Sequence, residues 1–188
     1  MVDAARTFDD AGSPWAMQTE SLIVRPARES DVPSMHEIYR HYVETTIVSF
    51  EETAPDLDDF AARLCKYRNG WACVVAELGG KVLGYAYGGP HRERAAYRWS
   101  VEMTIYVAPG LQRQGVGRGL YRVLLPMLAD AGYCNAYAGI ALPNPGSVGL
   151  HRAVGFTPIG TFPREGHKFG RWHDVMWFHL PLRESPPD

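Results

Sequence analysis

The segment of residues 112–117, which reads Gln-Arg-Gln-Gly-Val-Gly, constrains the fold of this chain more than any other stretch. It follows a β-rich run at 101–107 and opens a stretch with the apolar spacing of an amphipathic helix. The first turn of a helix carries unpaired N–H groups and the positive end of the helix dipole. The two glycines let a ligand approach those groups closely, and the polar side chains, with Arg118, supply donors and charge. Such a loop favours an anion such as pyrophosphate, although an ordinary glycine-containing loop before a helix is the alternative.

Two common phosphate-binding loops do not match this segment. A dinucleotide fingerprint needs a third glycine where the chain has Leu120, and a nucleoside-triphosphate loop needs Gly-Lys-Ser or Gly-Lys-Thr, which the sequence lacks. What remains, Gln-x-x-Gly-x-Gly, resembles the signature of the GNAT superfamily of acyl-CoA-dependent N-acetyltransferases. In that family the loop amides hold the pyrophosphate of coenzyme A. The resemblance therefore implies acetyl-CoA as the acetyl donor, bound by Gln112, Arg113, Gln114, Gly115, Val116, Gly117 and Arg118.

Length and composition restrict the class of protein. A chain of 188 residues and 21.0 kDa suits one domain with a full-sized core and leaves little room for a second. No apolar run approaches the ~18 residues that span a membrane. The acidic N-terminus lacks the pattern of a secretion signal, so a cytoplasmic enzyme is expected. A net charge of −2 with scattered basic residues argues against nucleic-acid binding.

The cysteines and histidines predict no metal site. Cys65, Cys73 and Cys134 form no Cys-x-x-Cys pair, and we expect them to be reduced and structural. His36 and His41 are five residues apart, so they do not share the helix face that a zinc-protease helix requires.

The pattern of elements predicts a mixed α/β domain at 21–182, preceded by a flexible extension at 1–20 and followed by a tail at 183–188. Helices are expected at 31–43, 56–66, 115–131 and 145–154. Strands are expected at 22–27, 71–78, 81–87, 101–107, 135–141, 156–162 and 175–180. Gly79-Gly80 predicts a two-residue hairpin, and Gly88-Gly89-Pro90 predicts a break. Pro126 should bend its helix or cost it a hydrogen bond.

This order of elements matches the GNAT fold over nearly the whole chain, which implies a central, mostly antiparallel sheet flanked by helices. Within the superfamily the sequence looks like the branch of phosphinothricin, methionine sulfone and methionine sulfoximine acetyltransferases. Segments at 46–51, 89–94, 96–97, 99, 101–102, 142–144, 147–151 and 170–175 carry that resemblance. The chain departs from the branch at His91, Arg98 and Pro126. The resemblance implies direct acetyl transfer to the α-amine of a small, amino-acid-like acceptor in a ternary complex.

Acetyl transfer to an amine requires a base, a polarised carbonyl and a protonated leaving thiol. Glu102 is a lone carboxylate in an apolar strand and matches the proposed base of the branch, although it could also be a solvent-facing strand acid. His151 stands where many GNAT enzymes have the tyrosine that protonates the thiolate, with a helix-surface role as the alternative. The resemblance also implies a backbone donor near Tyr106 or Val107, and cofactor contacts from Asn144 and Ser147.

The acceptor needs a cation and apolar walls. Arg94 can bind a carboxylate or phosphinate with two parallel hydrogen bonds, and Tyr97 adds a hydroxyl. Phe50 and Trp99 are the predicted walls, whereas a solvated surface loop is the alternative interpretation.

Three alternatives remain open at this stage. A GNAT enzyme could acetylate a protein N-terminus, a lysine or an aminoglycoside, although the basic loop at 91–98 favours an anionic acceptor. A non-catalytic acyl-CoA-binding domain is the second, and retention of Gly115, Gly117, Glu102 and Asn144 weighs against it. The third concerns assembly: the resemblance and the aromatic run Trp172, Trp177 and Phe178 imply a homodimer, unless these rings fill the monomer core.

Overall fold

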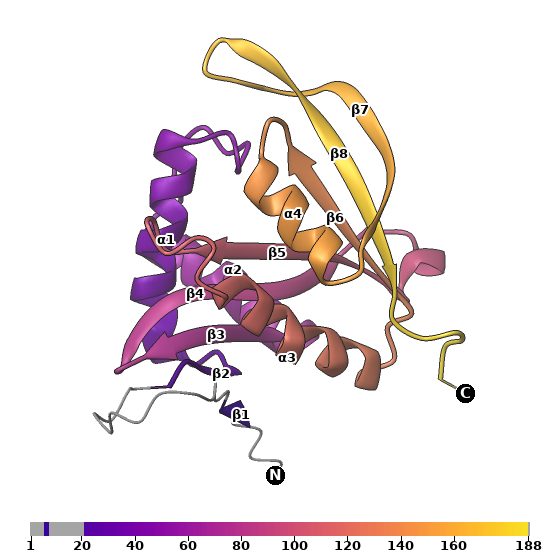
Figure 1. Ribbon diagram of the computed structural model, residues 1–188, viewed down its shortest axis with the longest axis horizontal. Helices are drawn as coiled ribbons and strands as arrows, with labels where there is room; N and C mark the ends of the chain where they lie inside the picture. The colour runs from indigo at the N-terminus through magenta and orange to yellow at the C-terminus, as the bar shows by residue number, and fades with distance from the viewer. Residues whose placement is uncertain (1–5, 8–20, 188) are drawn as a thin grey trace, which may run out of the picture.

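A single eight-stranded sheet forms the centre of the computed structural model, which describes residues 6–7 and 21–187 (Figure 1). Neighbouring strands follow the order β1-β2-β3-β4-β5-β6-β8-β7, and all pairs are antiparallel except the parallel pair of β5 and β6. The predicted mixed α/β fold with a mostly antiparallel sheet is confirmed. The strands are β1 (Arg6–Thr7), β2 (Ile23–Pro26), β3 (Cys73–Leu78), β4 (Lys81–Pro90), β5 (Ser100–Val107), β6 (Asn135–Ala141), β7 (Thr157–Lys168) and β8 (Arg171–Pro181). The helices are α1 (Val32–Thr45), α2 (Leu57–Gly70), α3 (Val116–Asp130) and α4 (Pro145–Ala153), with short 3-10 helices η1 (Glu29–Asp31) and η2 (Ala95–Tyr97).

Helices cover both faces of this sheet and bury two cores. Leu120, Leu124 and Leu128 repeat along α3, which crosses the front of the sheet in Figure 1, and all three are fully buried. On the opposite face α1 and α2 pack a second core that includes Met35 and Leu64. The spacing of these leucines by four residues therefore places them on the buried face of α3.

The predicted break at Gly88-Gly89-Pro90 is wrong, because β4 continues through it. A Cβ atom on Gly88 would lie 3.0 Å from Leu128 of α3, and one on Gly89 would lie 3.3 Å from Tyr67 of α2. The two glycines therefore let helices approach the strand from opposite faces. By contrast, Gly79 and Gly80 both have positive φ and form the predicted turn between β3 and β4.

The C-terminal hairpin is longer than predicted: β7 and β8 pair from Thr157–His179 to Lys168–Arg171. Helix α3 continues past Pro126 to its end at Asp130. The predicted flexible extension lies outside the described residues, apart from β1, which pairs with β2.

The parallel pair of β5 and β6 is short, and it positions the site. The strands are paired from Ser100–Asn135 to Glu102–Tyr137 only. Beyond Glu102, β5 continues beside β4, whereas β6 continues beside β8. The sheet therefore opens between its two central strands, and α4 begins just after β6.

Candidate active site

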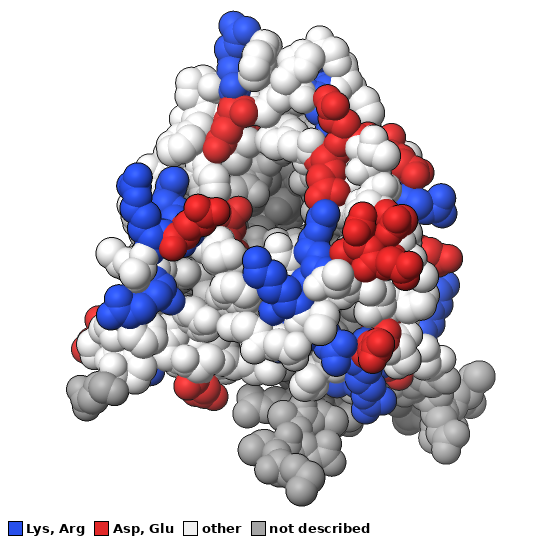
Figure 2. Space-filling model, turned by 180° about the vertical axis from the view of Figure 1, so that it is seen from behind, with Lys and Arg blue, Asp and Glu red and all other residues white. Residues whose placement is uncertain are grey.

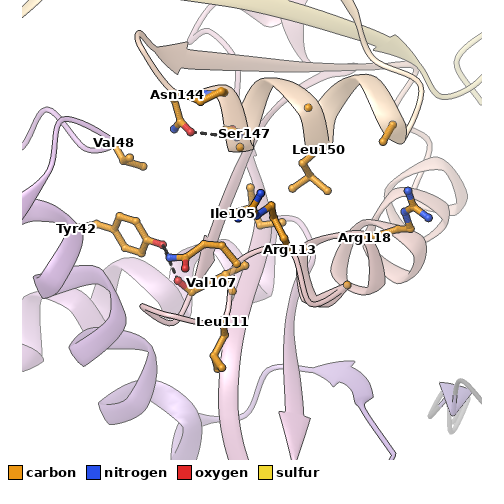
Figure 3. A pocket seen from close by; sticks show the side chains of 17 residues that line it. Tyr42, Val48, Ile105, Val107, Leu111, Arg113, Arg118, Asn144, Ser147 and Leu150 are labelled. Carbon is orange, nitrogen blue, oxygen red and sulfur yellow. Dashed lines mark hydrogen bonds between the residues drawn. The ribbon is translucent and has the colours of Figure 1, made fainter. Parts of the chain in front are cut away.

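A cleft of about 680 Å³ lies at this opening in the sheet (Figure 3). Its walls come from both faces: Tyr42 and Val48 belong to the side of α1, whereas Gly149 and Leu150 belong to α4. The cleft therefore passes between β5 and β6. It is lined by Tyr42, Val48, Ile105, Val107, Leu111, Gln112, Arg113, Gly115, Gly117, Arg118, Asn144, Pro145, Gly146, Ser147, Gly149, Leu150 and Ala153.

The glycine-containing loop forms one end of the cleft and has the backbone expected of an anion site. Gly115 is the residue before α3 and has a φ of 84°, a left-handed conformation that favours glycine. The N-terminus of a fifteen-residue helix therefore opens beside the cleft. Arg113 and Arg118 both line it and add positive charge.

Packing between two helices requires a glycine at position 117. A Cβ atom there would lie 2.8 Å from Cδ2 of Leu150, so the glycine lets α4 pack against the first turn of α3. Gly149 differs, because a Cβ atom on it would meet no atom within 4 Å, although it lines the same cleft. A substitution at Gly149, unlike one at Gly117, therefore tests ligand binding in the cleft without disturbing the packing of α3 and α4.

Eight of the eleven predicted cofactor residues line the cleft, namely Val107, Gln112, Arg113, Gly115, Gly117, Arg118, Asn144 and Ser147. The other three side chains point elsewhere. Gln114 donates to the carbonyl of Gly110, Val116 is buried in the core, and Tyr106 packs among the tyrosines near α1. The side chain of Asn144 accepts a hydrogen bond from Ser147 N (3.1 Å) and caps α4, so its amide nitrogen is the group left to meet a ligand.

Sequence reasoning missed Tyr42, whose hydroxyl donates to the carbonyl of Val107 at 2.6 Å. It lies within the helix predicted at 31–43, and the sequence of that helix does not indicate this contact. Because the N–H and C=O of one strand residue point the same way, the N–H of Val107 is also directed away from β4, into the opening. Ile105, two residues earlier, has the same orientation, whereas the carbonyl of Tyr106 faces Gly84 of β4. Of the two predicted backbone donors, the geometry favours Val107.

His151 is buried, with 2% of its surface exposed, and does not line the cleft. Its Nδ1 lies 2.8 Å from the carbonyl of Ser147, and its Nε2 lies 2.8 Å from the hydroxyl of Tyr121. Since a carbonyl only accepts, Nδ1 carries the proton and Nε2 accepts from the tyrosine. Burial lowers the pKa of His151 and so favours the neutral ring, and the hydrogen bond to the carbonyl of Ser147 offsets part of this shift. The group that stands between this histidine and the cleft is the hydroxyl of Ser147, 3.3 Å from Nδ1.

Glu102 marks the other end of the opening. Strand alternation places its side chain on the face opposite those of Ile105 and Val107. The side chain is 41% exposed, and its Oε2 lies 3.6 Å from Nδ1 of His91. Burial raises the pKa of Glu102; Arg92 acts against this shift. A raised pKa is the property expected of a general base.

The predicted acceptor residues are only partly brought together. Tyr97 is exposed, lies edge-on to His91 and has Arg92 above its ring at 6.0 Å. Arg94 is exposed on the same loop, yet Arg92 is the arginine that acts on Glu102 electrostatically. Nothing in the loop sequence distinguishes these two arginines.

The two predicted walls lie apart. The ring of Phe50 packs on Gly166, where a Cβ atom would be 2.3 Å away, and so reaches the β7–β8 hairpin. Trp99 packs beside Gly132 at the end of α3, with Arg98 above its ring.

The molecule seen from behind has a deep hollow with both acidic and basic side chains on its rim (Figure 2).

The described residues, 6–7 and 21–187, contain neither a metal-binding cluster nor a membrane-spanning helix. Within that part of the chain, His, Cys, Asp and Glu side chains form no group of three that could hold a metal ion. None of the described helices is both long and apolar enough to cross a bilayer.

Comparison with known proteins identifies the family and its fold. A family model described as an acetyltransferase (GNAT) domain matches residues 24–177. The chain is 40% identical over 167 residues to phosphinothricin N-acetyltransferase of Streptomyces viridochromogenes, covering 87% of this chain and 91% of that protein. It is 35% identical over 172 residues to an L-methionine sulfoximine/L-methionine sulfone acetyltransferase of Salmonella typhimurium, covering 89% and 99%.

A solved structure agrees with these relatives. The crystal structure of a phosphinothricin acetyltransferase from Sinorhizobium meliloti in complex with AcCoA has a TM-score of 0.85 and 35% identity, and covers 89% of this chain and 94% of that one. The predicted superfamily, branch and enzyme class are thereby confirmed. This chain belongs to the GNAT family of acetyltransferases.

Proposed function

We propose that this protein transfers the acetyl group of acetyl-CoA to the α-amine of a small, amino-acid-like acceptor of the phosphinothricin, methionine sulfone or methionine sulfoximine type. The observation that carries the proposal is the cleft through the sheet, with a cationic helix N-terminus at one end and a half-buried carboxylate beyond the other. Both substrates can enter from opposite faces and meet between β5 and β6. Such an arrangement supports direct transfer in a ternary complex.

The residues of the cleft fit acetyl-CoA. Its pyrophosphate would be held by the amides that follow Gly115, with charge from Arg113 and Arg118. The pantetheine arm would receive a hydrogen bond from the amide of Asn144. When bound, acetyl-CoA supplies a thioester, and Val107 N–H is the donor placed to polarise its carbonyl.

Proton transfers assign roles to two further residues. Glu102 accepts, through water, the proton that the acceptor's ammonium must lose before its nitrogen can attack. Ser147 lines the cleft and is placed to donate a hydrogen bond to the leaving thiolate, which then takes its proton from solvent. His151 assists by holding Ser147, because it contacts both the carbonyl and the hydroxyl of that residue.

This role for His151 can be separated from a purely structural one. Ser147→Ala and His151→Phe should both lower kcat and leave the KM for acetyl-CoA nearly unchanged. His151→Phe should also lower the free energy of unfolding by about 1–3 kcal/mol, since it leaves the buried hydroxyl of Tyr121 unpaired. Wild-type kcat for Ser147→Ala together with a large loss for His151→Phe would show that the histidine acts without the serine.

The acceptor site combines predicted and newly found residues. Arg94, predicted as the carboxylate ligand, shares its exposed loop with Arg92, which acts electrostatically on Glu102. Tyr97 lies beside Arg92 and adds a hydroxyl. We infer that this loop receives the acceptor's acid group, and that Phe50 forms an apolar wall.

A panel of acceptors tests the proposed function. Phosphinothricin, methionine sulfone, methionine sulfoximine, ordinary amino acids, polyamines and an N-terminal peptide should be compared by acetyl-CoA-dependent thiol release. Replacing the responsible arginine, Arg92 or Arg94, with Ala should raise the acceptor KM about 10- to 150-fold, because a hydrogen bond to a charged group contributes about 1.5–3 kcal/mol. Lysine there should restore only part of the loss. Equal kcat/KM for the best acceptor and its decarboxylated analogue would eliminate the carboxylate site and favour an amine or polypeptide acceptor.

We further infer a homodimer formed through the β7–β8 hairpin. The hairpin exposes four large apolar side chains, Ile159, Phe162, Phe169 and Trp172, and exposed apolar side chains that gather on one element are typical of an interface. Of the aromatic run that suggested a dimer, Trp172 is 51% exposed, whereas Phe178 is fully buried in the core. Light scattering should give about twice the 21.0 kDa mass of one chain, and Trp172→Asp should halve it. A 21.0 kDa species at micromolar concentration would rule the dimer out.

Location and physiological role follow from the same proposal. A cytoplasmic enzyme that acetylates such acceptors removes the positive charge of their α-amine, and we infer that it serves detoxification. Cell fractionation tests the location. Expression in a host sensitive to phosphinothricin or methionine sulfoximine should raise its tolerance, and Glu102→Gln should abolish the gain.

A further inference from the structure

His91 begins the loop after β4 and is fixed by aromatic neighbours. Its ring is stacked on Tyr137 of β6, with centroids 4.4 Å apart and planes 15° from parallel. Tyr97 and Trp177 each approach it edge-on at 6.2 Å. Because Tyr137 is the register partner of Glu102, this stack holds the imidazole next to the proposed base.

The nitrogen that faces the carboxylate has no other partner. Among the described residues, Nδ1 of His91 is buried without a hydrogen bond, and it lies 3.6 Å from Oε2 of Glu102. That separation is slightly longer than a hydrogen bond. The side chain of His91 is 12% exposed, whereas that of Glu102 is 41% exposed and therefore freer to turn. A small rotation of Glu102 therefore completes the bond and removes the cost of an unpaired buried atom.

The chemistry of the two groups sets the position of the proton between them. A carboxylate oxygen only accepts, and a bare Nδ1 would turn its lone pair toward another lone pair. The neutral ring must therefore carry its proton on Nδ1 when Glu102 is ionised. Such a donor favours the charged form of the base and lowers the pH at which it becomes active.

The surrounding groups determine how this pair titrates. Arg92, from the same loop, disfavours protonation of both His91 and Glu102. Glu165 of β7 acts on Glu102 in the opposite direction. The other titratable side chains around His91 are Tyr97, which approaches its ring edge-on, and Tyr137, beyond which lies His179 of β8.

We propose that His91 is a positioning residue for Glu102: its Nδ1–H holds and orients the carboxylate, so the acidic limb of the rate belongs to the pair rather than to Glu102 alone. This inference rests on the proposed role of Glu102 as the base. It gives a function to a position at which the chain departs from its branch.

Four variants test the inference through the dependence of kcat/KM on pH. His91→Phe keeps a ring to stack on Tyr137 but removes the donor, so the acidic limb should move upward by about 0.5–1 pH unit. His91→Asn places an amide N–H near the position of Nδ1 and should restore the wild-type limb. His91→Gln carries the same amide one methylene further out and should behave like His91→Phe. The KM for acetyl-CoA should stay constant in all three.

The fourth variant separates this inference from the role of the base. Glu102→Gln should abolish the acidic limb, and adding His91→Phe to it should change nothing further. If Glu102→Gln keeps the limb, the proposed base is wrong. If it loses the limb, but His91→Phe and His91→Gln leave the wild-type profile unshifted, the base stands and His91 has no part in it.

Discussion

A side chain placed at Gly149 should block the cofactor cleft without disturbing the fold. This glycine lies in the middle of α4 and lines the cleft, and a Cβ atom on it would meet nothing within 4 Å. Replacement with Val, which forms helices slightly better than glycine, should change the free energy of unfolding by no more than about 0.5 kcal/mol. The added methyl groups must then occupy space that the cofactor needs.

The expected loss of affinity follows from the cost of crowding. Forcing extra methyl groups into a filled site costs about 1–3 kcal/mol, which corresponds to about a 5- to 150-fold increase in Kd for acetyl-CoA. The series Gly149→Ala, Gly149→Val and Gly149→Phe should weaken binding in that order. Gly117→Val should differ, because its side chain meets Leu150 and should lower stability as well as affinity.

Titration calorimetry with acetyl-CoA measures the affinity, and urea unfolding measures the stability. Gly70→Val is the matched control, since Gly70 ends α2, lies outside the cleft and also has open space around it. A folded Gly149→Val protein that binds acetyl-CoA with wild-type affinity would refute the placement of the cofactor along α4.

Three further predictions concern charged groups. Glu102→Gln should lower kcat about 10²–10³-fold. This is the lower half of the range for a general base, because the side chain of Glu102 is 41% exposed. Glu165→Gln removes the same charge nearby and is the control, and its kcat should stay close to that of the wild type. Asp31→Asn should lower the free energy of unfolding by about 3 kcal/mol, since it breaks the two-bond pair with the guanidinium of Arg25. Burial raises the pKa of Asp31, but the hydrogen bonds that its carboxylate accepts from Arg25 and from the backbone of Arg28 outweigh burial and lower this pKa. The contribution of Asp31 to stability should therefore be complete above about pH 3.9 and should be lost as the pH falls below that value. Urea titrations that show no such loss of stability would contradict the pairing. Lys168→Met should cost about 1–3 kcal/mol in the same assay, because two buried carbonyls lose their charged donor.

Local chemistry explains which parts of the fold were predictable. The turn at Gly79-Gly80 was read correctly because positive φ is a property of the glycines themselves. Gly88 and Gly89 were misread because their role depends on helices that arrive from elsewhere in the chain. The long β7 was underestimated for a similar reason: its residues are mostly exposed and show no alternation of polar and apolar side chains.

The same distinction applies to the site. The anion loop is contiguous, so its residues could be found from their order alone. Tyr42 lies far along the chain from the adjacent residues His91 and Arg92, and each of the three interacts with a partner that only the fold brings to it. His151 shows the opposite case. Its position in the sequence matched that of a proton donor, but in the fold the ring is buried and both of its nitrogens are hydrogen-bonded.

The spacing along β5 determines how the proton leaves the acceptor. Ile105 and Val107, whose N–H groups point into the opening, lie three and five residues beyond Glu102, or roughly 10 and 17 Å along a strand. The amine must attack beside such a donor, whereas direct proton transfer needs contact at about 3 Å. In the proposed mechanism Glu102 therefore acts through one or more waters, and the 41% exposure of its side chain gives water that access. The separation is also compatible with the proposed hydrogen bond from His91 to the carboxylate. His91 lies beside Glu102 at the paired end of β5, whereas the proposed place of the acetyl group lies beyond it, where β5 and β6 have parted.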